Sequence, residues 1–175
     1  MKKQIVFIVL VFLSLFVSAQ QKQIDSLKTI IETTNSTFEK VDATHELANY
    51  YYLTDPDTIR EMCHQTLILS QESNYEKGIS DAAYWLGYMY YSQGNYRKSI
   101  YYYNLSLPYL KSQNDMEWVA TVYNNIALGY RDQGHLDSAI YFLNLAKDDY
   151  EKINHQTGMA TYYHNMGLIY DSKGM

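Results

Sequence analysis

The sequence predicts an all-α fold in which helical hairpins stack side by side as a solenoid. Three asparagines, Asn74, Asn114 and Asn154, are spaced 40 residues apart. Around them the chain repeats itself in one register, without insertion, over residues 83–96 (AYWLGYMYYSQGNY), 123–136 (YNNIALGYRDQGHL) and 163–175 (YHNMGLIYDSKGM). A repeat of this length is typical of solenoids, in which each unit buries its apolar face only by stacking on its neighbours.

The first 19 residues predict a secretory signal peptide. Lys2 and Lys3 give a positive start, an apolar run follows over residues 5–17, and small residues suited to cleavage come before Gln20. The run of 13 residues is shorter than the roughly 20 that a membrane-spanning helix needs. An uncleaved membrane anchor is the alternative. We therefore expect an exported, periplasmic protein whose mature chain begins at Gln20.

A capping helix is expected over residues 20–37, because the exposed end of a solenoid needs a cover. Four apolar residues give this segment an amphipathic pattern: Ile24, Leu27, Ile30 and Ile31. Ser36 and Glu39 then form a capping-box pattern, which predicts the start of the next helix.

Each repeat unit predicts a hairpin of two helices. In the first helix, apolar or small residues recur at i, i+3, i+4 and i+7, as on one face of a helix. These residues are Ala83, Leu86, Gly87 and Tyr90, then Tyr123, Ile126, Ala127 and Tyr130 in the next copy. The second helix turns Ser99, Tyr103 and Ser106 inward, and the next copy Ala139, Leu143 and Ala146. The glycines Gly94, Gly134 and Gly174 are expected to end the first helices, because glycine adopts the left-handed conformation at little cost.

An earlier, degenerate copy precedes these units. Its matching positions are Leu47, Ala48 and Tyr51 in the first helix and Ile59, Cys63 and Thr66 in the second. The expected units are therefore residues 38–77 (degenerate), 78–117, 118–157 and 158–175, of which the last holds only a first helix.

The last unit is expected to expose an apolar strip. Tyr163, Met166 and Tyr170 would face a second helix that the chain up to Met175 does not include. We therefore expect this chain to be a fragment of a longer protein and, alone, to self-associate through that end. Any membrane contact is expected only through a segment beyond residue 175.

The repeat pattern resembles the tetratricopeptide repeat. The resemblance rests on a pattern of residue types. The first helix has a large residue, then Leu, then Gly or Ala, and then Tyr. The turn has Gly, followed two residues later by Tyr or Leu, and the second helix has Ala or Ser. That family usually has units of about 34 residues. The resemblance implies a right-handed α-α superhelix whose first helices line a concave groove for a protein or peptide. On the groove side it places Tyr84, Trp85, Tyr88, Asn124, Asn125, Arg131, His164 and Asn165.

The asparagines on that side have two interpretations. The resemblance implies that Asn125 and Asn165 hold the backbone of a bound peptide, whereas a ladder of asparagines joining neighbouring helices explains them equally well. Arg131 is the one cation among the groove candidates. A pair of basic residues that would clamp a terminal carboxylate is therefore absent, and an acidic C-terminal tail is not the expected ligand.

The composition predicts no catalytic, metal or cofactor site. No HExxH motif, close Cys/His cluster, nucleophile elbow or phosphate loop is present, and Cys63 is the single cysteine. The net charge is −5, and it becomes −7 without Lys2 and Lys3, so nucleic acid is not an expected partner.

Three functions remain open from the sequence. The layout of leader, short helix and long tyrosine-rich repeats resembles the periplasmic part of bacterial sensor kinases and regulators, which implies a sensory fragment that binds a protein or peptide. The alternatives are a free-standing periplasmic or secreted adaptor and the helical domain of an enzyme whose catalytic part lies elsewhere. The gene sequence after codon 175 distinguishes among these three.

Overall fold

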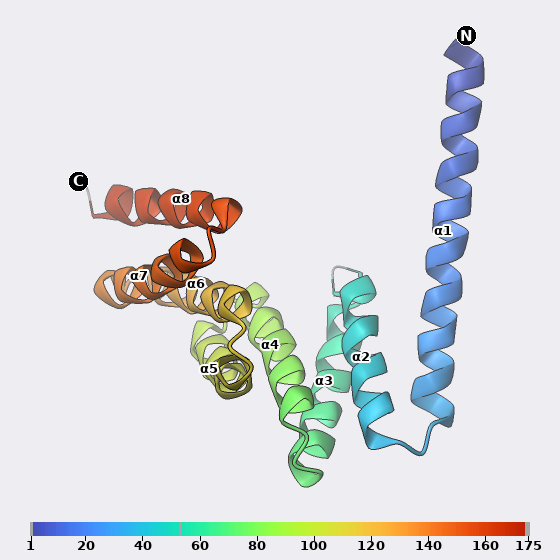
Figure 1. Ribbon diagram of the computed structural model, residues 1–175, viewed down its shortest axis with the longest axis horizontal. Helices are drawn as coiled ribbons and strands as arrows, with labels where there is room; N and C mark the ends of the chain where they lie inside the picture. Colours follow the sequence, from blue (N-terminus) through green and yellow to red (C-terminus); the bar gives the residue numbers. More distant parts are fainter. Residues whose placement is uncertain (1, 53, 174–175) are drawn as a thin grey trace.

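The computed structural model describes residues 2–52 and 54–173, with side chains described for residues 18–52 and 54–173. Over this part of the chain the fold is all-α, without a strand. The helices follow one another along an arc, with α1 and α8 at its opposite ends (Figure 1). They are α1 (Lys2–Thr33), α2 (Thr37–Tyr51), α3 (Pro56–Glu72), α4 (Glu76–Ser92), α5 (Tyr96–Ser112), α6 (Met116–Asp132), α7 (Leu136–Lys152) and α8 (Gln156–Ser172). The predicted all-α solenoid is confirmed.

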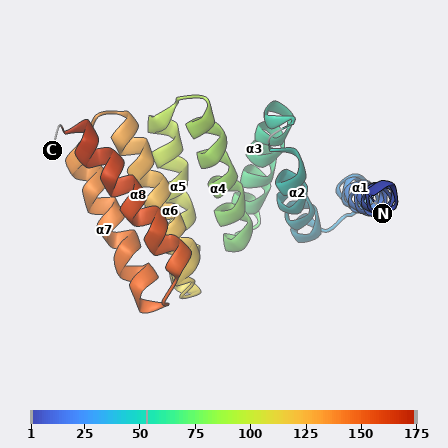
Figure 2. The ribbon, with the colours of Figure 1, turned by 90° about the horizontal axis from the view of Figure 1, so that it is seen from above.

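From α2 onward the helices form the predicted hairpins. The pairs are α2–α3, α4–α5 and α6–α7, and α8 follows as the first helix of a further unit (Figure 2). Helices α4, α6 and α8 begin at Glu76, Met116 and Gln156, and each is 17 residues long, so the 40-residue register is kept. We call α2, α4, α6 and α8 the A helices and α3, α5 and α7 the B helices.

The glycines that follow the A helices have the predicted conformation. Gly94 and Gly134 have φ of 72° and 79°, in the left-handed region that favours glycine. This conformation turns the chain back on the helix, so that the backbone N–H of Asn95 donates to the carbonyl of Tyr90 over 2.9 Å. Gly174, predicted for the same role, lies outside the described residues.

The asparagines in the 40-residue register form the corresponding left-handed turns after the B helices. Asn74, Asn114 and Asn154 have φ of 53°, 56° and 54°. Asparagine tolerates the left-handed conformation better than most side chains. The backbone N–H that follows Asn114, that of Asp115, donates to the carbonyl of Leu110 over 3.0 Å. These asparagines are therefore landmarks of the repeat because they shape its turns.

Small residues on the A helices face large residues on the B helices. Tyr103 is buried, and a Cβ atom added to Gly87 would lie 2.7 Å from its Cδ1. At the same positions one unit later, Ala127 and Leu143 are buried in one cluster. The bulkier Tyr103 thus requires glycine where Leu143 accepts alanine. The helices thus approach closely at Gly87 and Ala127, whereas a Cβ atom on Gly167, the small residue of the last unit, would have no neighbour within 4 Å.

One continuous helix, α1, spans the predicted leader and most of the predicted cap. Its second half packs on α2, where Ile24 and Leu27 are buried in a cluster with Ala43 and Leu47. This packing agrees with the capping role. The helix ends at Thr33, four residues before the expected limit of the cap, and it has no break between residues 19 and 20.

Residues 2–17 of the predicted leader are described only in their backbone. The side chains of its apolar run, residues 5–17, lie outside the described residues. Where the chain is described, no helix combines the length and the apolar character needed to cross a membrane.

Half of the predicted capping box is present at the start of α2. The Ser36 hydroxyl accepts a hydrogen bond from the backbone N–H of Glu39 over 3.3 Å. The Glu39 carboxylate accepts from the Thr34 hydroxyl over 2.6 Å, in place of the expected bond back to the backbone N–H of Ser36. That N–H instead donates to the Thr34 hydroxyl, so the three residues still close the helix end.

The last helix, α8, has one packed side and one open side. Met166 and Ile169 are buried with Ala127 and Leu143, so the expectation that Met166 lacks cover is wrong. Tyr163 is 63% exposed and Tyr170 is 41% exposed, as expected for the side that a B helix covers in the other units.

Candidate functional site

The A helices are joined by side chains that reach from one unit to the next. The Lys77 ammonium of α4 donates to Asp42 of α2 over 2.6 Å. The Tyr91 hydroxyl of α4 donates to Asp132 of α6 over 2.6 Å. We call the surface formed by the adjoining A helices the A-helix surface; the residues that the resemblance places on the groove side all belong to these helices.

Asn124 and Asn165 belong to a ladder between A helices. The Asn165 amide donates to the Asn124 side-chain oxygen over 2.8 Å, and the two residues are 8% (Asn124) and 5% (Asn165) exposed. A buried amide needs such a partner, because an unpaired polar group costs free energy. Of the two interpretations of the asparagines, this geometry favours the ladder for Asn124 and Asn165.

The same pair of positions meets in the other units with different residues. One unit earlier the pair is Asn125 and Tyr84, where burial raises the pKa of the Tyr84 hydroxyl and the Asn125 amide partly offsets the rise. In the degenerate unit the pair is Trp85 and His45, whose ring centroids lie 6.4 Å apart. The ladder position is thus constant, and the side chains that fill it vary.

The predicted residues Tyr84, Trp85 and Tyr88 come together as an aromatic cluster with Tyr52. The Tyr52 ring lies 5.3 Å from the Trp85 ring and 5.4 Å from the Tyr88 ring, measured between centroids. Trp85 is only 6% exposed, so it supports the surface from beneath. Tyr84 and Tyr88 are half-buried and present ring area for contact.

The two remaining candidates lie apart from this cluster. Arg131 is half-buried and forms an ion pair with Asp132, with 2.7 Å between Nη2 and Oδ1. Asp132 also accepts from Tyr91, so the Arg131 charge is already matched. His164 is exposed on α8. Neither residue adds to the aromatic cluster.

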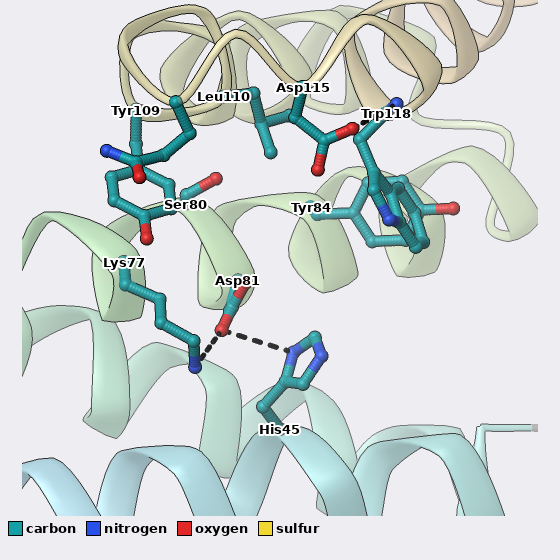
Figure 3. A pocket seen from close by; sticks show the side chains of 10 residues that line it. His45, Lys77, Ser80, Asp81, Tyr84, Tyr109, Leu110, Asp115 and Trp118 are labelled. Carbon is teal, nitrogen blue, oxygen red and sulfur yellow. Dashed lines mark hydrogen bonds and ion pairs between the residues drawn. The ribbon is translucent and has the colours of Figure 1, made fainter.

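A pocket of about 410 Å³ opens beside Tyr84, between α2, α4, α5 and α6 (Figure 3). It is lined by His45, Lys77, Ser80, Asp81, Tyr84, Tyr109, Leu110, Gln113, Asp115 and Trp118. Of these only Tyr84 was a predicted site residue. The Trp118 ring, which is 46% exposed, stands edge-on to the Tyr84 ring with 5.1 Å between centroids.

The repeat register explains why the pocket lies at Trp118. The residues 40 positions before and after it are Gly78 and Gly158. Both glycines allow close packing: a Cβ atom on Gly78 would lie 2.7 Å from Val41, and one on Gly158 would collide with Tyr150. An indole ring cannot occupy the space of a glycine hydrogen, so α6 does not approach α4 as closely as α2 approaches α4.

The pocket is lined by residues at the repeat positions that make those close contacts in the neighbouring units. Leu110 lines the pocket and lies 40 residues after Ser70 and 40 before Tyr150, the side chains that meet Gly78 and Gly158. Helix α2 packs on α4 and α6 packs on α8, whereas α4 and α6 lack comparable packing. The bulky residue in a glycine register was the sequence signal that could have located this pocket.

The charges beside the pocket are dominated by carboxylates. The Lys77 ammonium lies 2.6 Å from Asp42 and 3.1 Å from Asp81. Burial opposes the charged form of Lys77, but the two carboxylates outweigh it and raise the pKa of the ammonium group. Asp115 caps α6 by accepting from the backbone N–H of Trp118 over 3.2 Å, and its second oxygen has no hydrogen bond to any described residue.

His45 is held close to one of these carboxylates. Its Nδ1 lies 3.9 Å from the Asp81 carboxylate and has no hydrogen bond to a described residue (Figure 3). Burial lowers the pKa of the imidazole, and the nearby Asp81 opposes that shift only in part. The imidazole is therefore neutral at neutral pH, which leaves Lys77 as the single cation among the residues that line the pocket, beside the carboxylates of Asp81 and Asp115.

The described residues offer no assembly suited to a metal. Among them, no three or more His, Cys, Asp or Glu side chains are close enough to hold a metal ion. Cys63 is buried, and burial raises the pKa of its thiol to about 12, so it is an unreactive core residue.

Stacked helical hairpins whose A helices are joined by side-chain contacts define an α-helical repeat scaffold. Residues 78–152 match the family model of the tetratricopeptide repeat. This segment carries tetratricopeptide repeats, as its repeat pattern predicts, and proteins with such repeats generally bind other proteins. No curated protein matches the sequence.

Two solved structures show how widely the fold is shared. The TPR domain of Arabidopsis FLU is similar with a TM-score of 0.61 and 21% identity, over 67% of this chain and 99% of that one. BtubC (BKLC) from P. vanneervenii is similar with a TM-score of 0.73 and 17% identity, over 91% of this chain and 66% of that one. At these identities the likeness concerns the fold alone.

Proposed function

We propose that the A-helix surface binds a segment of a partner protein. The observation that carries the proposal is the aromatic cluster beside an open pocket, because Tyr84, Tyr88 and Trp118 all present ring area there. Tyrosine and tryptophan are enriched where proteins bind each other, since they bury much area with few rotatable bonds. The segment would lie across α4 and α6, with the pocket as its deepest point.

A selection of peptides on this chain tests the proposal. Peptides selected from a displayed random library would be measured against the unmodified chain, Tyr88→Ala and Tyr141→Ala. Tyr141 is a matched control because it is an exposed tyrosine on the B helix α7. We expect Tyr88→Ala to weaken binding at least about tenfold, as truncation of a central aromatic residue does. Binding that is unaffected by Tyr88→Ala, or equally weakened by Tyr141→Ala, would argue against this surface.

We propose further that the protein is exported to the periplasm. The positive start and the apolar run of residues 5–17 support this proposal, together with small residues before Gln20. Fusion of residues 1–30 to a phosphatase that is active only outside the cytoplasm tests it. Activity of the fusion, loss of activity when Lys2 and Lys3 become glutamate, and a mature N-terminus at Gln20 are expected. A fusion that stays inactive and keeps its N-terminus would refute it.

We also propose that the binding surface serves as the sensory region of a signalling protein. The support is the layout of leader, capping helix and tyrosine-rich repeats, which resembles that of bacterial sensor kinases and regulators. The gene sequence after codon 175 tests the idea. A continuing frame with an apolar run of about 20 residues and a signalling module is expected. A stop codon would favour the adaptor.

A further inference from the structure

The A-helix surface carries excess negative charge beside the pocket, and this charge favours a partner with a positive group. The two cations of α4 and α6, Lys77 and Arg131, are each already paired with carboxylates. Beside the pocket, Lys77 is shared between Asp42 and Asp81, and Asp115 has no ion pair with any described residue, so negative charge is in excess there. An anionic group entering the pocket would meet these carboxylates, whereas a cation would complete their pairing.

The walls of the pocket suit a flat cation rather than a compact one. Trp118 and Tyr84 stand edge-on to each other, which leaves part of the indole face open to a ligand. A cation over such a face is attracted to it, most strongly when the ring is tryptophan. A guanidinium is planar, weakly hydrated and able to stack on a ring while its N–H groups reach a carboxylate.

We propose that the pocket receives the guanidinium of an arginine in the partner segment, between the Trp118 indole and the free oxygen of Asp115. This inference rests on the proposed function, because it names the side chain that the A-helix surface would recognise. The stem of the arginine would lie along Tyr84 and Leu110, which line the same pocket. Asp81 would attract the charge from the opposite wall, where Lys77 and His45 already contact it (Figure 3).

The test uses N-acetyl-L-arginine amide as the probe. The isosteric but uncharged N-acetyl-L-citrulline amide is its control. The chain has two tryptophans, so in a Trp85→Phe background the tryptophan fluorescence, excited at a wavelength that tyrosine does not absorb, comes from Trp118 alone. We expect the arginine probe to give a saturable change in this fluorescence and the citrulline probe to give none. Equal responses to the two probes would overturn the proposal.

Asp115 allows a matched pair of variants. Asp115→Asn removes the charge but keeps an N-cap residue, since asparagine caps helices as well as aspartate does. Asp55→Asn makes the same change at the N-cap of α3, away from this pocket. Asp115→Asn should weaken binding of the probe about tenfold, the value of one charge-assisted hydrogen bond, and Asp55→Asn should leave it unchanged. Equal losses in the two variants would mean non-specific attraction and would overturn the site.

The arginine site and the proposed function can fail separately. If selected peptides bind and depend on Tyr88 but the arginine probe does not change Trp118 fluorescence, the arginine site is refuted while the binding surface stands. If selected peptides do not depend on Tyr88 and the probe has no effect, both are refuted.

Discussion

Gly87 and Tyr103 allow the pairing of small and large residues between A and B helices to be tested as a double-mutant cycle. Gly87→Ala would place a Cβ atom 2.7 Å from the Tyr103 ring. Overpacking of this kind costs about 1–3 kcal/mol, and the better helix propensity of alanine returns about 1 kcal/mol. The net loss of stability is therefore up to about 2 kcal/mol.

A second substitution should relieve the clash. Tyr103→Leu alone leaves a cavity and costs roughly 2–4 kcal/mol. The double variant reproduces the pairing of Ala127 with Leu143 in the next unit, where both residues are buried. We therefore expect a favourable coupling energy of about 1–3 kcal/mol between the two substitutions.

Urea denaturation of the single and double variants measures this coupling, provided that the slope of the transition stays constant. Gly167→Ala is the matched control, because a Cβ atom there has no neighbour within 4 Å. It should stabilise α8 by about 0.5–1 kcal/mol through helix propensity alone. If Gly87→Ala stabilises the chain as much as Gly167→Ala does, or if the coupling is below about 0.5 kcal/mol, the packing argument is wrong.

Three further predictions concern the ladder, the histidine and the last helix. Asn165→Ala leaves the buried side-chain oxygen of Asn124 without its donor and should cost about 1–3 kcal/mol in urea denaturation, and a loss below about 0.5 kcal/mol would argue against the ladder. Because burial holds the pKa of His45 below its ordinary 6.5, the unfolded chain binds more protons and stability falls as the pH drops through and below 6.5. His45→Gln should make the fall between pH 7.5 and pH 5.5 shallower, and an unchanged fall would contradict the assignment. Amides of residues 160–172 should exchange hydrogen much faster than those of residues 120–132, and the chain should self-associate through α8; equal protection in a monomeric chain would refute both.

The sequence predicted the fold well because its signals are local. The left-handed turns need glycine or asparagine, so Gly94 and Gly134 located the ends of A helices directly. Apolar spacing located the inward residues, such as Leu86 and Leu143, because a helix places every third or fourth residue on one face. These signals require no knowledge of the neighbouring helix.

The site was harder to predict because it depends on distances between helices. The resemblance placed Asn124 and Asn165 on the A helices, toward the groove, but their burial follows from how close α6 lies to α8. The pocket depends on the opposite effect, since Trp118 holds α6 away from α4. The repeat pattern did not single out Asp81 or Asp115, although both residues line the pocket.

The presence of Trp118 at a position where the neighbouring units have glycine also bears on how the array bends and on how motion in one unit affects the next. A solenoid is cooperative only through the interfaces between neighbouring units, so its weakest interface sets where it bends or opens. Because α4 and α6 pack on each other less than α2 packs on α4 or α6 on α8, we expect the two halves of the array to flex against each other at this junction. A ligand bound there would contact both halves and would bind best in one relative orientation of the two halves. Occupancy of the pocket would therefore stiffen the array and join the motions of its two ends.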